Sequence, residues 1–316
     1  MRKKISLILT AILLFCSLAA CGNKNEEYVD DGKIQIVTTV FPAYDFAREI
    51  GGDRASVTLL IPPGSEIHSY EPTPQDIIKI QNCDLFIYNG GESDKWVEGV
   101  LESLSGERNT IAMLQCVTAL EEEIKEGMYS RESGEDGEGE PEYDEHVWTS
   151  PKNAAIISAA IADSLSEIQS DGAPYFRERL KAYSDRLNEL DAAFREAVAN
   201  GERRTLIFAD RFPVRYFTEE YGLDYFAAYP GCAEEAEPSA KTVAFLIDRV
   251  REDKTPYVLY IEFSNEKMAD VICEETGCGK LLFHSAHNVS KADMENGVTY
   301  LGLMEKNVET IKEALG

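Results

Sequence analysis

The chain has 316 residues, of which 44% are hydrophobic, so it is long enough for two domains of ordinary size with substantial cores. It contains 57 acidic and 31 basic residues, which gives a formal net charge of −26. This balance argues against nucleic-acid binding, which requires a basic surface. It suits a protein that meets cations outside the cytoplasm, although acidity is also a common means of keeping a protein soluble.

The amino-terminal segment has the pattern of an export signal. The basic sequence MRKK precedes the apolar stretch ISLILTAILLFCSLAA, which is too short and too soon followed by polar residues to predict a transmembrane span. The next motif, LAAC, reads as a lipobox. It predicts a signal peptide over residues 1–20 and a lipid on Cys21, which anchors a polar tether over residues 21–32. An ordinary signal peptide that is cleaved after small residues is the alternative.

The following residues alternate between strand and helix patterns. Strands are expected over residues 34–40, 55–61, 84–90 and 109–117, and helices over residues 41–52, 74–82 and 96–104. The loop over residues 61–76, IPPGSEIHSYEPTPQD, separates the second strand from its helix, and its prolines exclude regular structure. It holds His68, which is either a solvated loop histidine or a ligand held at the carboxyl end of the sheet.

Residues 121–145 break this alternation because they are strongly acidic, rich in glycine and almost free of apolar side chains. We expect a mobile insertion without a packed core, which acts either as a solvated loop or as a loose collector of cations. The motif DEHVWTSPKNA ends it and supplies His146. Ser150 and Pro151 in this motif are typical of a helix start.

Two helices are expected over residues 151–169 and 174–200, and the alternation then resumes. In the second half, strands are expected over residues 205–210, 224–231, 257–263 and 280–288, and helices over residues 212–222, 239–253, 265–277 and 298–315. The sequence therefore predicts an α/β protein with two lobes, each built on a mainly parallel sheet flanked by helices. The predicted amino-terminal lobe covers residues 33–170, the linking helix residues 171–202 and the carboxyl-terminal lobe residues 203–316.

All four histidines fall in loops or at the ends of predicted strands, where open α/β sheets bind ligands. Two acidic residues share this placement. The candidate ligands are His68, His146, Asp210, Glu262, His284 and His287. Two facing lobes would bring them into one cleft, and imidazole with carboxylate suits Zn²⁺ or Mn²⁺.

The cysteines give no sign of a thiolate metal site, because none of them forms a CxxC pair. Five of the seven follow Cys21, and an odd number in an exported chain leaves at least one thiol unpaired. Cys273 and Cys278 are close enough in sequence to bridge across a helix end, but the sequence does not decide whether they do.

Five segments carry a resemblance to a known family. They are PPGSEIHSYEPTPQD, DLFIYNGGESDKWVE, DEHVWTSPKNA, YIEFSNEKMADVICEETG and NGVTYLGLMEKNVETIKEAL. The chain resembles the substrate-binding lipoproteins of ABC importers for zinc and manganese over nearly all of its mature length. The resemblance implies two lobes, a rigid helical linker and one metal ion held between the lobes. It also implies a monomer that delivers the ion to a membrane permease and has no enzymatic activity. Two competing functions are a metallohydrolase that uses Glu262 as general base and a surface adhesin.

The resemblance identifies the metal ligands of the amino-terminal lobe more directly than those of the carboxyl-terminal lobe. His68 and His146 match the two amino-terminal ligands directly. The segment of the third ligand, FADRFPVRYF, departs from the family pattern because Ala209 takes the ligand position. Asp210 is the nearby oxygen donor there, and Arg211 beside it is able to pair with it instead.

The fourth ligand is expected at His284 or His287, one of them binding and the other supporting. Glu262 either coordinates the ion or is a buried acid paired with Arg211 or a ligating imidazole. Three possible imidazoles favour Zn²⁺, with Mn²⁺ as the alternative.

Overall fold

The computed structural model describes residues 32–65, 70–104, 106, 108–129, 142–231 and 239–316. The predicted signal peptide, Cys21, His68 and Cys232 lie outside these ranges. Within them, no helix is both long enough and apolar enough to cross a membrane.

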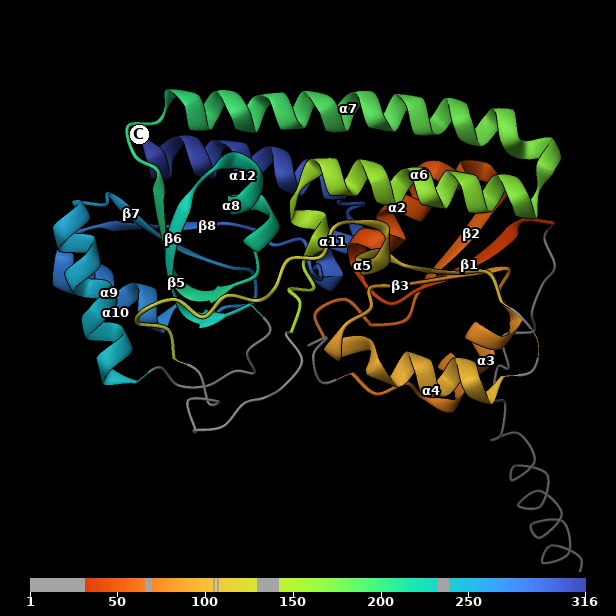
Figure 1. Cartoon of the computed structure of the whole chain (residues 1–316), viewed down its shortest axis with the longest axis horizontal. Helices are drawn as coiled ribbons and strands as arrows, with labels where there is room; N and C mark the ends of the chain where they lie inside the picture. Colours follow the sequence, from red (N-terminus) through yellow and green to blue (C-terminus); the bar gives the residue numbers. More distant parts are fainter. Residues whose placement is uncertain (1–31, 66–69, 105, 107, 130–141, 232–238) are drawn as a thin grey trace, which may run out of the picture. The chain divides into compact units, whose positions relative to one another are not determined.

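Two parallel four-stranded sheets organise residues 34–316, in agreement with the predicted fold class (Figure 1). The first sheet has the order β2–β1–β3–β4, so the chain enters it in the middle. Its strands are β1 (Ile34–Thr38), β2 (Ala55–Leu59), β3 (Leu85–Tyr88) and β4 (Thr110–Ala112). The second sheet has the order β6–β5–β7–β8. Its strands are β5 (Thr205–Phe212), β6 (Asp224–Pro230), β7 (Tyr257–Tyr260) and β8 (Gly279–Leu282).

Some of the helices that follow these strands begin next to a residue whose side chain caps the first turn. Thr73 and Asp76 form a capping box at the first turn of α3, and the Ser239 hydroxyl accepts a hydrogen bond from the backbone of Thr242 in α9. The helices of the first half are α2 (Phe41–Gly51), α3 (Pro74–Asn82), α4 (Lys95–Ser103) and α5 (Met113–Cys116), with the short turns η1 (Gly52–Arg54), η2 (Glu92–Asp94) and η3 (Val147–Thr149). Those of the second half are α8 (Arg215–Tyr221), α9 (Ala240–Asp253), α10 (Lys267–Thr276), α11 (Lys291–Glu295) and α12 (Tyr300–Leu315).

Two long helices connect the halves. α6 (Pro151–Ile168) leads through η4 (Ser170–Gly172) into α7 (Ala173–Asn200), which has 28 residues. α7 packs against α2 and α6 from the first half and against α12 from the second, and Figure 1 shows it running along both α6 and α12. Because α7 buries apolar side chains along its whole length, from Phe176 to Val198, it belongs to the core of both halves rather than to a loose connection.

Buried contacts join the two halves close to this helix layer. The Phe46 ring of α2 packs edge-on against Tyr300 of α12, with ring centres 4.9 Å apart. The Tyr300 backbone N–H donates to the Asp45 carboxylate at 2.8 Å, and its hydroxyl donates to the Trp148 carbonyl at 2.6 Å. Burial raises the pKa of Asp45 to about 6.

Several predicted boundaries are wrong. The strand expected over residues 109–117 ends at Ala112, where α5 begins. The strand expected over residues 280–288 ends at Leu282, so the histidines after it lie in a loop. β5 continues to Phe212, which places Asp210 inside the strand instead of at its end. The single helix expected over residues 298–315 begins at Tyr300 and is preceded by the separate α11, which the sequence analysis missed.

The first part of the acidic insertion is packed, contrary to the expectation of a mobile segment without a core. The Tyr129 backbone N–H donates to the Ala228 carbonyl of β6 at 2.9 Å, and the Lys125 ammonium lies 4.0 Å from the centre of the Tyr225 ring. Gly127 has a φ of 87° and lies so close to Phe245 that a Cβ atom there would meet the ring at 2.1 Å. Most of the remaining insertion, residues 130–141, lies outside the described residues.

Candidate metal centre

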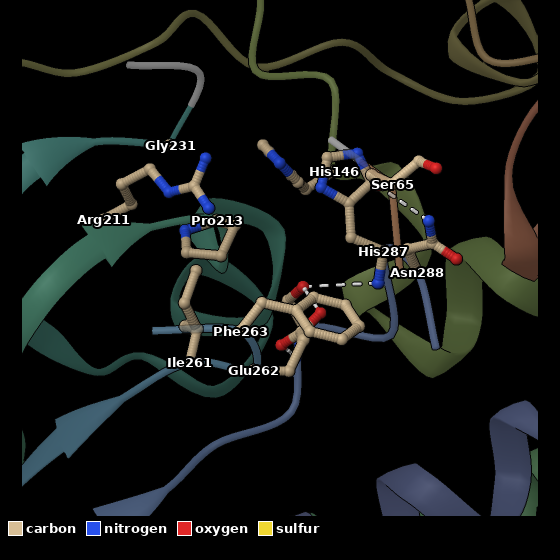
Figure 2. Close-up of a pocket in the computed structure, with 11 residues that line it drawn as sticks. Ser65, His146, Arg211, Pro213, Gly231, Ile261, Glu262, Phe263, His287 and Asn288 are labelled. Carbon is tan, nitrogen blue, oxygen red and sulfur yellow. Dashed lines mark hydrogen bonds between the residues drawn. The ribbon is translucent and has the colours of Figure 1, made fainter. Parts of the chain in front are cut away.

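A pocket at the carboxyl edges of the sheets gathers several of the predicted residues. Its walls come from the proline loop, the segment after the acidic insertion, β5 and the loops after β6, β7 and β8. They are formed by Ser65, His146, Arg211, Pro213, Gly231, Ile261, Glu262, Phe263, Ser285, His287 and Asn288. Figure 2 shows these side chains converging from the two halves of the chain.

His146 is fully buried and is held in one orientation by Asp144. Its backbone N–H and its Nδ1 lie 2.8 and 3.1 Å from the same Asp144 oxygen. Burial by itself lowers the pKa of His146, but the charge and hydrogen bond of Asp144, together with the charges of Glu145 and Glu122, leave the pKa above its ordinary value. A proton on Nδ1 that is shared with Asp144 leaves the lone pair on Nε2, which is the arrangement of a metal-ligating histidine with a carboxylate behind it.

The segment that carries His146 is clamped from both halves. The Tyr216 hydroxyl of α8 donates to the Asp144 carbonyl at 2.8 Å, and the Asn89 amide donates to the Glu145 carbonyl at 2.9 Å. Ser93 donates its backbone N–H and its hydroxyl to the Glu145 carboxylate at 2.8 and 2.5 Å. These contacts hold the two residues just before His146 from both halves of the chain, so the position of the imidazole is set before any ligand arrives.

His287 lies beside His146 in the same pocket. The two imidazole ring centres are 4.8 Å apart with their planes at 78°. Trp148 borders both rings at 5.6 and 5.2 Å, and its indole N–H donates to the Ser285 carbonyl at 2.8 Å. The structure thus brings together two of the predicted ligands, one from each half of the chain.

The loop after β8 is shaped by Ser285 and Glu262. The Ser285 backbone N–H donates to one Glu262 oxygen at 2.7 Å and its hydroxyl to the other at 2.5 Å. The same hydroxyl accepts the His287 backbone N–H at 3.2 Å, and Ala286 between them has a φ of 60°. The carboxylate of Glu262 is therefore connected through Ser285 to the backbone of His287.

Two predicted ligands do not line the pocket. The Nδ1 of His284 accepts the Ala286 backbone N–H at 3.0 Å and lies 3.7 Å from Glu262, and Asn307 holds the backbone of His284 by two hydrogen bonds. Asp210 accepts backbone N–H groups of Arg211 and Ile261 at 2.8 and 3.4 Å, and burial raises its pKa. Both residues support the loops around the pocket in this structure.

His68 lies outside the described residues, but the loop on its amino-terminal side is tied to the pocket. The Asn288 amide donates to the carbonyls of Pro62 and Ser65 at 3.0 and 2.8 Å. Within the described part of the chain, no group of three or more His, Cys, Asp or Glu side chains is placed so that it could hold a metal ion.

Sequence reasoning missed the supporting residues Trp148, Ser285 and Asn288. The hydrogen bond from the Trp148 indole to the Ser285 carbonyl joins residues 137 positions apart, so no local pattern indicates it. Ser285 stands between the two predicted histidines, which is the one local signal for it. Asn288 carries no sequence signal, because its partners lie more than 220 residues away.

Comparison with known proteins places this geometry in context. Residues 36–314 match the family model described as zinc-uptake complex component A, periplasmic. The zinc-binding lipoprotein AdcA of Streptococcus pneumoniae is 34% identical over 313 residues, which cover 98% of this chain and 61% of AdcA. The high-affinity zinc uptake system protein ZnuA of Bacillus subtilis is 30% identical over 323 residues, which cover 100% of this chain and 99% of ZnuA. The chain thus spans only about 61% of the length of AdcA.

Solved structures show the same fold. The Zn(II)-bound ZnuA-like domain of S. pneumoniae AdcA superposes with a TM-score of 0.72 and 30% identity, covering 90% of this chain and 99% of that domain. The metal-dependent lipoprotein YcdH of B. subtilis gives a TM-score of 0.75 and 27% identity, covering 90% of this chain and 100% of that protein.

Proposed function

The chain belongs to the family of zinc-uptake complex component A, periplasmic, and from this premise we propose that it captures Zn²⁺ outside the cytoplasm. In this proposal it is a monomeric solute-binding protein, anchored by a lipid on Cys21, that hands the ion to the permease of an ABC importer. Mn²⁺ is the alternative cargo, and we favour zinc because the pocket is rich in imidazole.

The observation that carries the proposal is the pairing of His146 with His287. Two imidazoles that bind one Zn²⁺ tetrahedrally through bonds of 2.0–2.1 Å have ring centres roughly 5 Å apart. The 4.8 Å between these rings matches that spacing. Asp144 contacts the ring of His146, as supporting carboxylates of metal-binding histidines do, and Ser285 holds the backbone of His287.

We propose His68, His146 and His287 as the ligands. Glu262 then supplies negative charge at the pocket wall and holds the His287 loop through Ser285, and His284 and Asp210 keep supporting roles. Both Glu262 oxygens accept hydrogen bonds from Ser285, which favours a binding role over the general-base role that a metallohydrolase would require. For the same reason we propose no enzymatic activity.

The domain plan follows from the same proposal. The two halves joined by α7 correspond to an amino-terminal lobe over residues 33–170 and a carboxyl-terminal lobe over residues 203–316, with the cargo held between them. Signal-peptide removal at residues 1–20 and a tether over residues 21–32 complete the exported form.

Metal analysis of protein purified without added metal, followed by competitive Zn²⁺/Mn²⁺ titration, tests this function. We expect one Zn²⁺ per chain, held more tightly than Mn²⁺. His287→Ala should lower zinc affinity by orders of magnitude, since the ligand count falls from three to two. Preferential binding of Mn²⁺, or no stoichiometric metal, would overturn the assignment of zinc as cargo.

A further inference from the structure

Two cysteines outside the metal pocket lie against each other at the end of α10. Cys273 is in the last turn of this helix and Cys278 stands immediately before β8. Their sulfur atoms are 3.5 Å apart, and both residues are partly buried. The other cysteines of the described residues are placed differently: the Cys83 and Cys116 thiols each donate to a backbone carbonyl within their own local turn, at 3.2 and 3.5 Å.

The backbone between the two residues is fixed by hydrogen bonds, so their approach does not depend on a flexible loop. Gly277 has a φ of 79° and donates its N–H to the Cys273 carbonyl at 2.8 Å, which reverses the chain. The Thr276 hydroxyl donates to the Ile272 carbonyl at 2.7 Å and accepts the Cys278 N–H at 3.3 Å. Gly279 then pairs with the Pro256 carbonyl at 2.8 Å and begins β8.

We propose that Cys273 and Cys278 form a disulfide in the exported protein, which closes the turn between α10 and β8. The proposal rests on the proposed function in one respect, because export places the chain where disulfides persist.

The bond forms by thiol–disulfide exchange with a small or protein disulfide as the oxidant. The thiolate of one cysteine displaces one sulfur of the oxidant, which forms a mixed disulfide and releases the first oxidant thiol. The other cysteine then loses its proton and attacks the protein sulfur of the mixed disulfide, which releases the second oxidant thiol. The protein loses two protons and two electrons, and the oxidant is reduced to two thiols.

The bridge would act on the strand that leads into the metal pocket. Among the described strands, β8 lies at the edge of its sheet and pairs only with β7. The loop with Ser285 and His287 begins directly after Leu282, the last residue of β8. A bond that ties the start of β8 to α10 therefore steadies the strand from which this half of the pocket is presented.

Peptide mapping of the exported full-length chain tests the proposal. The protein is acid-trapped, alkylated with iodoacetamide without reductant and digested with trypsin. Both cysteines fall in the single tryptic peptide over residues 268–280, because Lys267 and Lys280 flank them. We expect this peptide to be unalkylated and lighter by two hydrogens, and to take two alkyl groups only after reduction, whereas Cys83 and Cys116 are alkylated directly.

Two other results would overturn the proposal. One is alkylation of both cysteines of the peptide without reductant, even when the protein has first been incubated with oxidised glutathione. The other is a cross-link from this peptide to the tryptic peptide over residues 216–241, which contains Cys232.

Thermal unfolding with and without reductant gives a second readout. The short loop predicts that reduction lowers the melting temperature by roughly 5 °C. Cys273→Ser should abolish this difference, whereas the matched variant Cys83→Ser should keep it. A difference that survives in Cys273→Ser would count against the bridge. Zinc titration of the same samples tests the proposed function independently of the disulfide. If the protein binds no zinc, the proposed function is contradicted, and the peptide map still tests the disulfide.

Discussion

Replacing Ser285 by alanine is the sharpest test of how the pocket is held together. The Ser285 hydroxyl donates to Glu262 at 2.5 Å and accepts the His287 backbone N–H at 3.2 Å, so one atom connects a partly buried carboxylate with a proposed ligand. Ser285→Ala removes this connection and retains the Ser285 backbone N–H that donates to the other Glu262 oxygen at 2.7 Å. None of the proposed ligands is changed.

The expected loss follows from the charge of the acceptor. A hydrogen bond to a charged group contributes about 1.5–3 kcal/mol, and each 1.4 kcal/mol corresponds to a factor of ten in affinity. Losing the Ser285 hydroxyl should therefore weaken zinc binding by about 10- to 100-fold, which is also the usual cost of removing a residue that supports a metal ligand. Direct removal of His287 should cost more.

Competition with a chromogenic chelator at fixed pH measures the zinc affinity of each variant. Ser158→Ala is the matched control, because Ser158 is also buried and its hydroxyl donates to the Ala154 carbonyl at 2.7 Å, within α6. This control should bind zinc like the unmodified chain. If Ser285→Ala has unchanged affinity and an unchanged circular dichroism spectrum, the Glu262–Ser285 connection does not support the site.

Three further outcomes are expected. His146→Ala should reduce zinc affinity by orders of magnitude and His284→Ala only modestly, as read by calorimetry; equal losses would place His284 among the ligands. Zinc affinity should fall as the pH drops through the raised pKa of His146, because protons then compete with zinc for the imidazole. Asp144→Asn should move this fall to lower pH, because it removes the charge that raises the pKa of His146. A zinc affinity that stays constant from pH 8 to 5 would contradict histidine ligation. Replacing residues 130–141 with a short glycine–serine linker should leave the affinity unchanged in the same chelator assay, and a loss would assign the acidic insertion to the site.

The sequence determined the fold class because its signals are local. Apolar runs predict strands and capped amphipathic patterns predict helices, so their alternation predicts βα units. The strands read as continuous apolar runs because a parallel sheet is buried on both faces. Ser150 caps the helix that the sequence assigned to it, and Thr73 caps the helix expected from residue 74. The same logic placed the histidines at the carboxyl edge of the sheets, since that edge is fixed by strand direction.

Strand ends were predicted less well, because tertiary contacts decide where a strand stops. Asp210 was expected at the end of its strand, but β5 continues through it to Phe212, whose ring stacks on Tyr225 at 3.5 Å. The apolar run that begins at Leu281 continues to Phe283, yet β8 ends at Leu282. The hydrogen bonds that shape the following loop come from Glu262 and Asn307. Neither partner is adjacent in the sequence.

What the sequence by itself determined is therefore the α/β architecture and a short list of candidate ligands. Only the tertiary structure decided which of them face one another: His146 and His287 meet in the pocket, whereas His284 and Asp210 are turned into the supporting loops. The physical reason is that a ligand's direction is set by hydrogen bonds from distant residues. Trp148 and Ser285 show this most clearly, since the contact that joins the two halves of the pocket spans 137 residues.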